Sequence, residues 1–260
     1  MAGGLSLYAE GESLLHRAHP FTKGVLMISS IALAFIAPSI PWVLVVLAAL
    51  IAVVIVAGVI RRMLTAALAL LLPLVVLLLP VQSFVYAQNH TVLFDFGGPF
   101  VFYREGLAYG VMLSLRIACL VAATFLFSFT TRPADITEAL MQRGLSPRMG
   151  YVLQSALQII PQTLDLAGRI QDAQRARGLE TEGSLLRRSR AYLPLMLPLV
   201  LSSLVATQER AMALEVRGFG LPVKRLRRYE FIDSTPQVVL RWVLALAPPA
   251  AVVARVAGWN

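Results

Sequence analysis

Two pairs of arginine and glycine, forty residues apart, are the residues of this chain whose types and spacing best suit a chemical role. The first pair ends the stretch Ala173–Gly178 and the second ends Ala213–Gly218, so both fit the pattern Ala-x-x-x-Arg-Gly. The planar guanidinium fork of arginine is well suited to charged pairing in a protein interface. The repeated pattern therefore favours two similar docking points for two similar soluble partners.

Each pair also has an alternative interpretation as an ordinary helix end. Glycine is the usual residue just past a helix C-terminus, and arginine in the last turn favours the negative end of the helix dipole. A single Arg-Gly pair is more often such a cap than a binding site. The recurrence of the spacing within one charged segment favours docking, and on the residues alone both interpretations stay open.

The composition of the chain indicates a membrane protein with several spans. Of its 260 residues, 58% are hydrophobic and 14% are charged, and the mean hydropathy is +0.73. Globular domains are about half apolar and about a quarter charged. We therefore predict an all-α polytopic helix bundle, because several apolar runs reach the roughly 20 residues that cross a bilayer. There are five such runs: roughly Phe21–Ala37, Pro41–Ile60, Met63–Tyr86, Gly106–Phe129 and Gln237–Val256.

The distribution of charge orients these spans. A net charge of +9 in a soluble protein would favour nucleic acid as a partner, whereas cytoplasmic loops of membrane proteins carry Lys and Arg as a rule. Arg17, Lys23 and the pair Arg61-Arg62 therefore place the N-terminus and the connection between the second and third spans in the cytoplasm. We expect a lipid bilayer around the spans and no nucleic-acid partner.

The segment 132–235 differs from the rest of the chain, because it holds 15 of the 23 basic and 10 of the 14 acidic residues. We expect it to be cytoplasmic or interfacial. The predicted organisation is a membrane bundle of four spans at 1–131, this charged segment at 132–235 and a last span at 236–260. The connection near 87–105 has apolar, strand-forming residues on both sides of Gly97-Gly98, which suits either a β-hairpin or an irregular interfacial loop.

Three helices are expected in the charged segment. A short one begins at Pro133, with acidic residues in its first turn, and ends near Gly144. A long one begins at Ser146-Pro147 and ends at the first Arg-Gly pair. A basic turn at 187–190 then leads into a third helix, which ends at the second Arg-Gly pair.

Apolar residues on the second and third of these helices favour contact with the membrane or a membrane protein. The third helix opens with an apolar stretch, Tyr192–Ala206, of about fifteen residues, which is short for a crossing. We prefer an interfacial or buried helix there over a sixth span. On the long second helix an apolar stripe repeats at helical spacing, opposite a polar stripe. The apolar stripe includes Leu153, Leu157, Ile160 and Leu164.

Arg116 lies near the middle of the apolar run Gly106–Phe129. A central arginine costs about 2.5–3.5 kcal/mol on insertion scales, so it is a functional candidate, with simple packing in a polar pocket as the alternative. The chain has no Gly-x-x-x-x-Gly-Lys-Ser/Thr, His-Glu-x-x-His or Cys-x-x-Cys motif, and His16 and His19 lack a third ligand. We expect no catalytic residue, no metal site and no cofactor.

Taken together, these motifs resemble the transmembrane T component of energy-coupling factor (ECF) transporters, a class of ABC importers for vitamins and metal ions. The resemblance covers nearly the whole chain and rests first on Ala176-Arg177-Gly178 and Val216-Arg217-Gly218. Val216 stands where the family often has alanine, and His19 and Phe21 replace the family's usual Asp and Arg. Other similar positions are His16–Lys23, Arg104–Leu107, Pro133, Leu140, Gly144 and Pro147.

The resemblance implies a coupling subunit of a bacterial inner membrane transporter, with a cytoplasmic N-terminus. Two long helices would cross beneath the membrane, and Arg177 and Arg217 would each dock into one of two ABC ATPase subunits, or into the two copies of a homodimer. The apolar stripe would hold a small membrane S component that binds the substrate. The substrate itself stays open, because the S component selects it.

Other classes of protein remain as alternatives on the residues alone. Gly183 followed by Leu193-Pro194 faintly resembles the cytoplasmic loop of ordinary ABC-importer permeases, which have one coupling loop per subunit. An integral membrane enzyme would need paired acids or a metal set near the membrane face, but the acids here lie among helix-surface charges. A secondary transporter would need ionisable residues near mid-membrane, and only Arg116 is of that kind.

Overall fold

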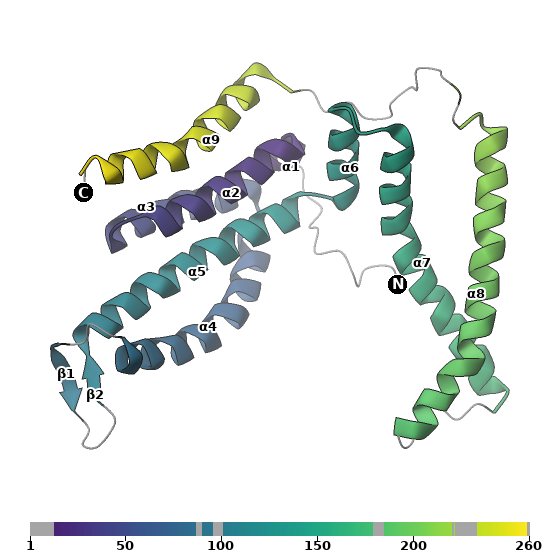
Figure 1. The fold of residues 1–260 in the computed structure, drawn as a ribbon, viewed down its shortest axis with the longest axis horizontal. Coiled ribbons are helices and arrows are strands. Elements are labelled where there is room, and N and C mark those ends of the chain that lie inside the picture. The colour runs from purple at the N-terminus through teal and green to yellow at the C-terminus, as the bar shows by residue number, and fades with distance from the viewer. Residues whose placement is uncertain are drawn as a thin grey trace. The chain divides into compact units, whose positions relative to one another are not determined.

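The computed structural model of the chain describes residues 13–86, 90–95, 101–178, 185–219, 221 and 233–258, most of which are helical. These residues divide into two compact units (Figure 1). In chain order the elements are α1 (Leu14–Arg17), α2 (Pro20–Ile36), α3 (Ile40–Ala57), α4 (Ile60–Val85), β1 (Val92–Asp95), β2 (Val101–Tyr103), α5 (Arg104–Thr130), α6 (Pro133–Gln142), α7 (Pro147–Ala176), α8 (Leu185–Val216) and α9 (Thr235–Val256). The larger unit contains α1–α5, the strands, α9 and most of α6, and the smaller unit contains α7 and α8.

Among the described helices, α3, α4, α5 and α9 are long and apolar enough to cross a bilayer. The helix α2 is also apolar but has only 17 residues. These five helices match the five predicted spans to within a few residues, so the predicted all-α membrane bundle is confirmed. The helix α4 continues through Pro73 and Pro80, which membrane helices tolerate where neighbouring groups satisfy the freed backbone carbonyls.

The bundle is built around α2 and α5, which lie side by side (Figure 1). The helices α3 and α4 pack on α5, and α9 packs on α2. Side chains at these contacts are small or medium in size, which lets helix backbones approach closely where the hydrophobic effect offers no drive between helices. Those with almost no exposed surface include Ala34, Val43, Val54, Cys119, Ala123 and Leu126.

The connection between α4 and α5 forms a β-hairpin rather than an irregular loop. The strands β1 and β2 are antiparallel, with Val92 opposite Tyr103 and Asp95 opposite Val101. The backbone N–H of Tyr103 donates to Ser83 Oγ at 3.0 Å, and the Ser83 hydroxyl donates to the Tyr103 carbonyl at 3.2 Å. These bonds fasten β2 to α4. The predicted Gly97-Gly98 turn lies outside the described residues.

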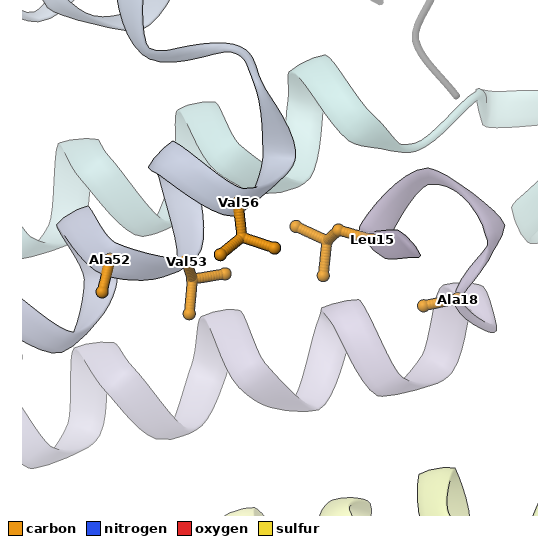
Figure 2. A pocket seen from close by; sticks show the side chains of 5 residues that line it. All are labelled: Leu15, Ala18, Ala52, Val53 and Val56. Carbon is orange, nitrogen blue, oxygen red and sulfur yellow. The ribbon is translucent and has the colours of Figure 1, made fainter. Parts of the chain in front are cut away.

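The single turn α1 was not predicted from the sequence. Ser13 caps it, because its Oγ accepts a hydrogen bond from the backbone N–H of His16 at 3.4 Å. An apolar pocket of about 330 Å³ lies between this turn and α3 (Figure 2). Ligand sites usually add a few polar groups that fix orientation, and the lining side chains supply none. They are Leu15, Ala18, Ala52, Val53 and Val56.

In the smaller unit, α7 and α8 pack as an antiparallel pair whose ribbons cross in Figure 1. Arg210 Nη2 donates to Gln162 Oε1 at 3.4 Å, and the rings of Tyr151 and Phe219 lie 5.0 Å apart. The two predicted long helices are therefore confirmed. The predicted basic turn at 187–190 is wrong, because α8 already begins at Leu185. Leucine and arginine are good helix formers, so nothing in that stretch stops the helix.

Gly110 lies where α5 packs tightly on α4 and gives a test of this packing. A Cβ atom at this position would lie 3.3 Å from both Leu79 Cδ2 and Gln82 Cβ. We expect Gly110→Leu to destabilise the bundle by about 1–3 kcal/mol through overpacking, measured as a lower thermal unfolding midpoint in detergent. The matched control is Gly168→Leu, where nothing lies within 4 Å. Equal losses in the two variants would contradict this account.

Candidate functional site

Both Arg-Gly pairs lie at the C-terminal ends of the two long helices of the smaller unit. The helix α7 ends at Ala176 and α8 ends at Val216, so each arginine directly follows the last helical residue. Gly178 has φ +91° and Gly218 has φ +70°, which is the left-handed conformation that only glycine adopts without strain. The cap interpretation therefore explains the glycine of each pair.

Backbone N–H groups satisfy the carbonyls at the end of α8. The N–H of Gly218 donates to the Glu215 carbonyl and that of Phe219 to the Leu214 carbonyl, each at 2.9 Å. This is the Schellman arrangement, in which the chain that follows the helix supplies the donors. At the end of α7, the N–H of Gly178 likewise donates to the Arg175 carbonyl at 2.9 Å. The caps thus form without using an arginine side chain.

The side chains of Arg177 and Arg217 are exposed. Only their backbone N–H groups form hydrogen bonds with residues that the structure describes, at 3.1 Å to the Gln174 carbonyl and 3.2 Å to the Ala213 carbonyl. Val216, beside the second arginine, is 89% exposed. A guanidinium carries five N–H donors in a fixed fork, so each helix ends in a charged group that can bind a planar acceptor on another molecule.

The predicted apolar stripe of α7 is exposed along its length. Leu153 and Leu157 are 41% and 44% exposed, and Ile160 and Leu164 are each 55% exposed. Met149 is also exposed on this face, and it was not predicted although it precedes Leu153 by four residues. The contact with α8 uses Gln162, from the opposite polar stripe. The apolar stripe is therefore not what joins α7 to α8.

The first half of α8 exposes apolar side chains as well. Contiguous apolar surface of this kind is rare on soluble monomers and marks contact with a protein or a membrane. It corresponds to the stretch that we expected to be interfacial or buried. The exposed side chains are Met196, Leu197, Val200, Leu201, Leu204 and Val205.

Arg116 binds the end of α2, a partner that the sequence did not reveal. Its Nη2 donates to the Ala37 carbonyl at 3.0 Å, and its guanidinium carbon lies 5.9 Å from the centre of the Phe35 ring. A helix of 17 residues is about 26 Å long, less than the roughly 30 Å of bilayer hydrocarbon. The last carbonyls of α2 therefore need donors within apolar surroundings, and Arg116 supplies one.

Arg255 does the same from the end of α9, where its Nη1 donates to the Ile36 carbonyl at 3.1 Å. This contact was not predicted from the sequence. His16 and His19 have local roles at helix ends. His16 Nδ1 lies 2.7 Å from Ser13 Oγ, and His19 Nδ1 accepts from the N–H of Phe21 at 3.2 Å, which caps α2.

Known proteins are similar to this chain over most of its length. The sequence model of the CbiQ family, described as a cobalt transport protein, matches residues 11–228. The chain belongs to the CbiQ family. The energy-coupling factor transporter transmembrane protein EcfT of Brevibacillus brevis is 33% identical over 85% of this chain and 86% of that relative.

Two further proteins with the same description agree. The one from Listeria innocua is 30% identical over 88% of this chain and 91% of its own length. The one from Lacticaseibacillus paracasei is 28% identical over 93% of this chain and 97% of its own length. This CbiQ-family chain is therefore the transmembrane component of an ECF transporter. It is a multi-pass membrane subunit of a larger complex rather than an enzyme.

The contact between Arg116 and α2 predicts a structural phenotype. We expect Arg116→Leu to leave the Ala37 carbonyl without its donor, at a cost of about 1–3 kcal/mol. The thermal unfolding midpoint of the purified chain should fall by a few degrees, while the other transporter subunits still copurify with it. Arg104→Leu, at an exposed arginine on the same helix, is the control. An unchanged midpoint in Arg116→Leu would show that this contact carries no stability.

Proposed function

We propose that this chain couples ATP hydrolysis by two ABC ATPase subunits to substrate uptake through a small membrane S component. The observation that carries the proposal is the pair of exposed arginines, Arg177 and Arg217, whose side chains form no bond with the described residues. In each case the glycine that follows already caps the helix. The cap interpretation therefore accounts for Gly178 and Gly218 but gives the two arginine side chains no role.

The similarity of the two ends supports two similar partners. Each end has an arginine directly after the helix, with a small or apolar residue before it, Ala176 or Val216, and a left-handed glycine after it. A charged fork beside an apolar contact suits a groove with acceptor groups on a soluble protein. Two ATPase subunits, whether different chains or the two copies of a homodimer, offer two such grooves.

The apolar surfaces of α7 and α8 support contact with an S component. The stripe Leu153, Leu157, Ile160 and Leu164 lies opposite the side of α7 that bonds α8, so a second protein can cover it without separating the pair. A membrane-embedded protein of small size would bury these side chains. The same two helices would then touch the soluble subunits at their ends and the S component along their length.

The orientation of the chain follows from its basic residues. Arg61 and Arg62 are exposed at the start of α4, and the segment 132–235 is rich in charge. We infer a bacterial inner membrane protein with a cytoplasmic N-terminus, a bundle at 1–131, a cytoplasmic coupling region at 132–235 and a last span at 236–260. This orientation would bring Arg177 and Arg217 to the side where ATP is available.

The mechanism that follows is mechanical. ATP binding would draw the two ATPase subunits together, and the arginine anchors would move α7 and α8 with them. The S component held along the apolar stripe would then tilt and release its substrate inward. In this cycle the two ATPase subunits would bind the nucleotide. A vitamin or metal ion is the expected class of substrate, and the S component chooses among them.

The two arginines give the main test of this proposal. Removing one partner of a buried, hydrogen-bonded charge pair costs about 2–5 kcal/mol, so Arg177→Ala or Arg217→Ala should weaken one of two contacts. The double variant should lose the ATPases in copurification and abolish ATP-driven uptake while staying inserted in the membrane. Lysine should rescue poorly, because it lacks the planar fork.

Arg169→Ala, at an exposed arginine of α7 outside the pattern, is the matched control and should keep both ATPases and uptake. Full uptake by the double alanine variant would show that the two Arg-Gly pairs serve only as helix caps.

The apolar stripe gives an independent test. We expect Ile160→Glu to release the S component from the purified complex while the ATPases remain bound, because a charge would have to be buried in the contact. Gln158→Glu adds the same charge on the opposite, polar side of α7 and is the control. The measurement is the stoichiometry of copurified subunits. If the Ile160→Glu complex retained the S component, the apolar stripe would not be part of the interface with it.

A further inference from the structure

The first turn of α2 contacts the two stretches of the larger unit that lead along the chain to and from the smaller unit. The chain leaves the bundle at the end of α5, continues through α6 into α7 and α8, and returns at the start of α9. The departure and the return are separated by about a hundred residues of sequence. Both are nonetheless bonded to the short stretch His19–Lys23.

Lys23 holds the departing connection. Its side chain is only 5% exposed, and its Nζ donates to the Thr130 carbonyl at 2.8 Å and to the His16 carbonyl at 3.0 Å. Thr130 is the last residue of α5. The carboxylate of Asp135, in the first turn of α6, attracts the same ammonium group. One buried cation thus ties α2 to the end of one helix and the beginning of the next.

Thr22 and His19 hold the returning connection. Arg241 Nη2 donates to Thr22 Oγ1 at 3.1 Å. The same guanidinium forms a bidentate ion pair with Asp233, with Nη2–Oδ1 at 2.6 Å and Nη1–Oδ2 at 3.2 Å. The backbone N–H of His19 donates to Gln237 Oε1 at 3.1 Å. Asp233 and Gln237 lie just before and within the first turn of α9.

These contacts are of the kind that resists displacement. Hydrogen bonds with an ionised partner are about twice as strong as neutral ones, and bidentate pairs also fix geometry. A buried ammonium whose acceptors moved away would be left unpaired at high cost. Because Thr22 and Lys23 are neighbours on one helical turn, a pull on either connection acts on the same point of the bundle.

We propose that His19, Thr22 and Lys23 form a clamp that joins the two connections, so that motion of the smaller unit reaches the membrane bundle as a single displacement of α2. The proposal rests on the function proposed above. The clamp residues are positioning residues, since they touch neither nucleotide nor substrate in this scheme. Without the clamp, the two connections would move separately and less of the motion would reach α2.

The test measures coupling rather than stability. The complete transporter, with its ATPases and S component, is reconstituted in lipid vesicles, and uptake and ATP hydrolysis are measured in the same sample. The probe is whichever labelled compound the wild-type complex accumulates from a panel of Co²⁺, Ni²⁺, riboflavin, biotin and thiamine. We expect Lys23→Met and Asp233→Asn each to lower uptake per ATP hydrolysed by tenfold or more, with ATP hydrolysis and subunit stoichiometry retained.

Arg255→Met is the matched control, because it removes a cation that also binds α2, but at the helix end away from the connections. It should keep the wild-type ratio of uptake to hydrolysis. If Lys23→Met does not accumulate in the membrane, Thr22→Val combined with Gln237→Leu is used instead. This variant removes the contacts of α2 with the start of α9 and should lower the ratio of uptake to hydrolysis in the same way.

Wild-type ratios in the clamp variants would overturn the proposal, as would equal losses in Arg255→Met. Failure of the function proposed above has a different signature. In that case the wild-type complex itself would show no ATP-driven uptake, or the double Arg177→Ala, Arg217→Ala variant would keep its ATPases and its uptake. A coupled wild type with coupled clamp variants would leave that function intact and reject only the clamp.

Discussion

The carbonyl groups at the C-terminal end of a helix need donors, and in apolar surroundings water cannot provide them. In the bundle, cations from neighbouring helices meet this need. Lys23 donates to the end of α5, and Arg116 and Arg255 donate to the last carbonyls of α2. The mutual arrangement of α2, α5 and α9 depends on these bonds, because each cation reaches its carbonyl only when the helices pack in this register.

The smaller unit meets the same need in another way. Left-handed glycines let the chain after α7 and α8 turn back and supply backbone donors to the helix ends. The side chains of the arginines beside these glycines therefore take no part in capping. The contrast separates two classes of cation in one chain. Lys23, Arg116 and Arg255 are bonded within the bundle, whereas the side chains of Arg177 and Arg217 bond none of the described residues and are the ones that we propose bind a partner.

The sequence predicted the spans, the ends of α6 and α7 and the end of α8, because length, hydropathy and glycine at a helix end are local signals. It did not predict the partner of Arg116 or the role of Arg255, since both depend on where α2 ends relative to helices distant in sequence. The basic stretch at 187–190 was misassigned as a turn, because its charge was taken for a break in the helix. Docking of the Arg-Gly pairs stays a prediction, because it involves partner proteins that are separate chains.

The pairing of α2 with α9 has a consequence for biosynthesis. Arg241 and Thr22 are 219 residues apart, and so are Arg255 and Ile36. During synthesis from the N-terminus, α2 enters the bilayer long before either arginine has been made, and α7 and α8 emerge in between. Until α9 is inserted, the nascent bundle therefore lacks the hydrogen bonds that Arg241 and Arg255 donate to α2. A product truncated within α9 would carry both Arg-Gly pairs on a bundle that cannot close, and would be a natural substrate for membrane quality control.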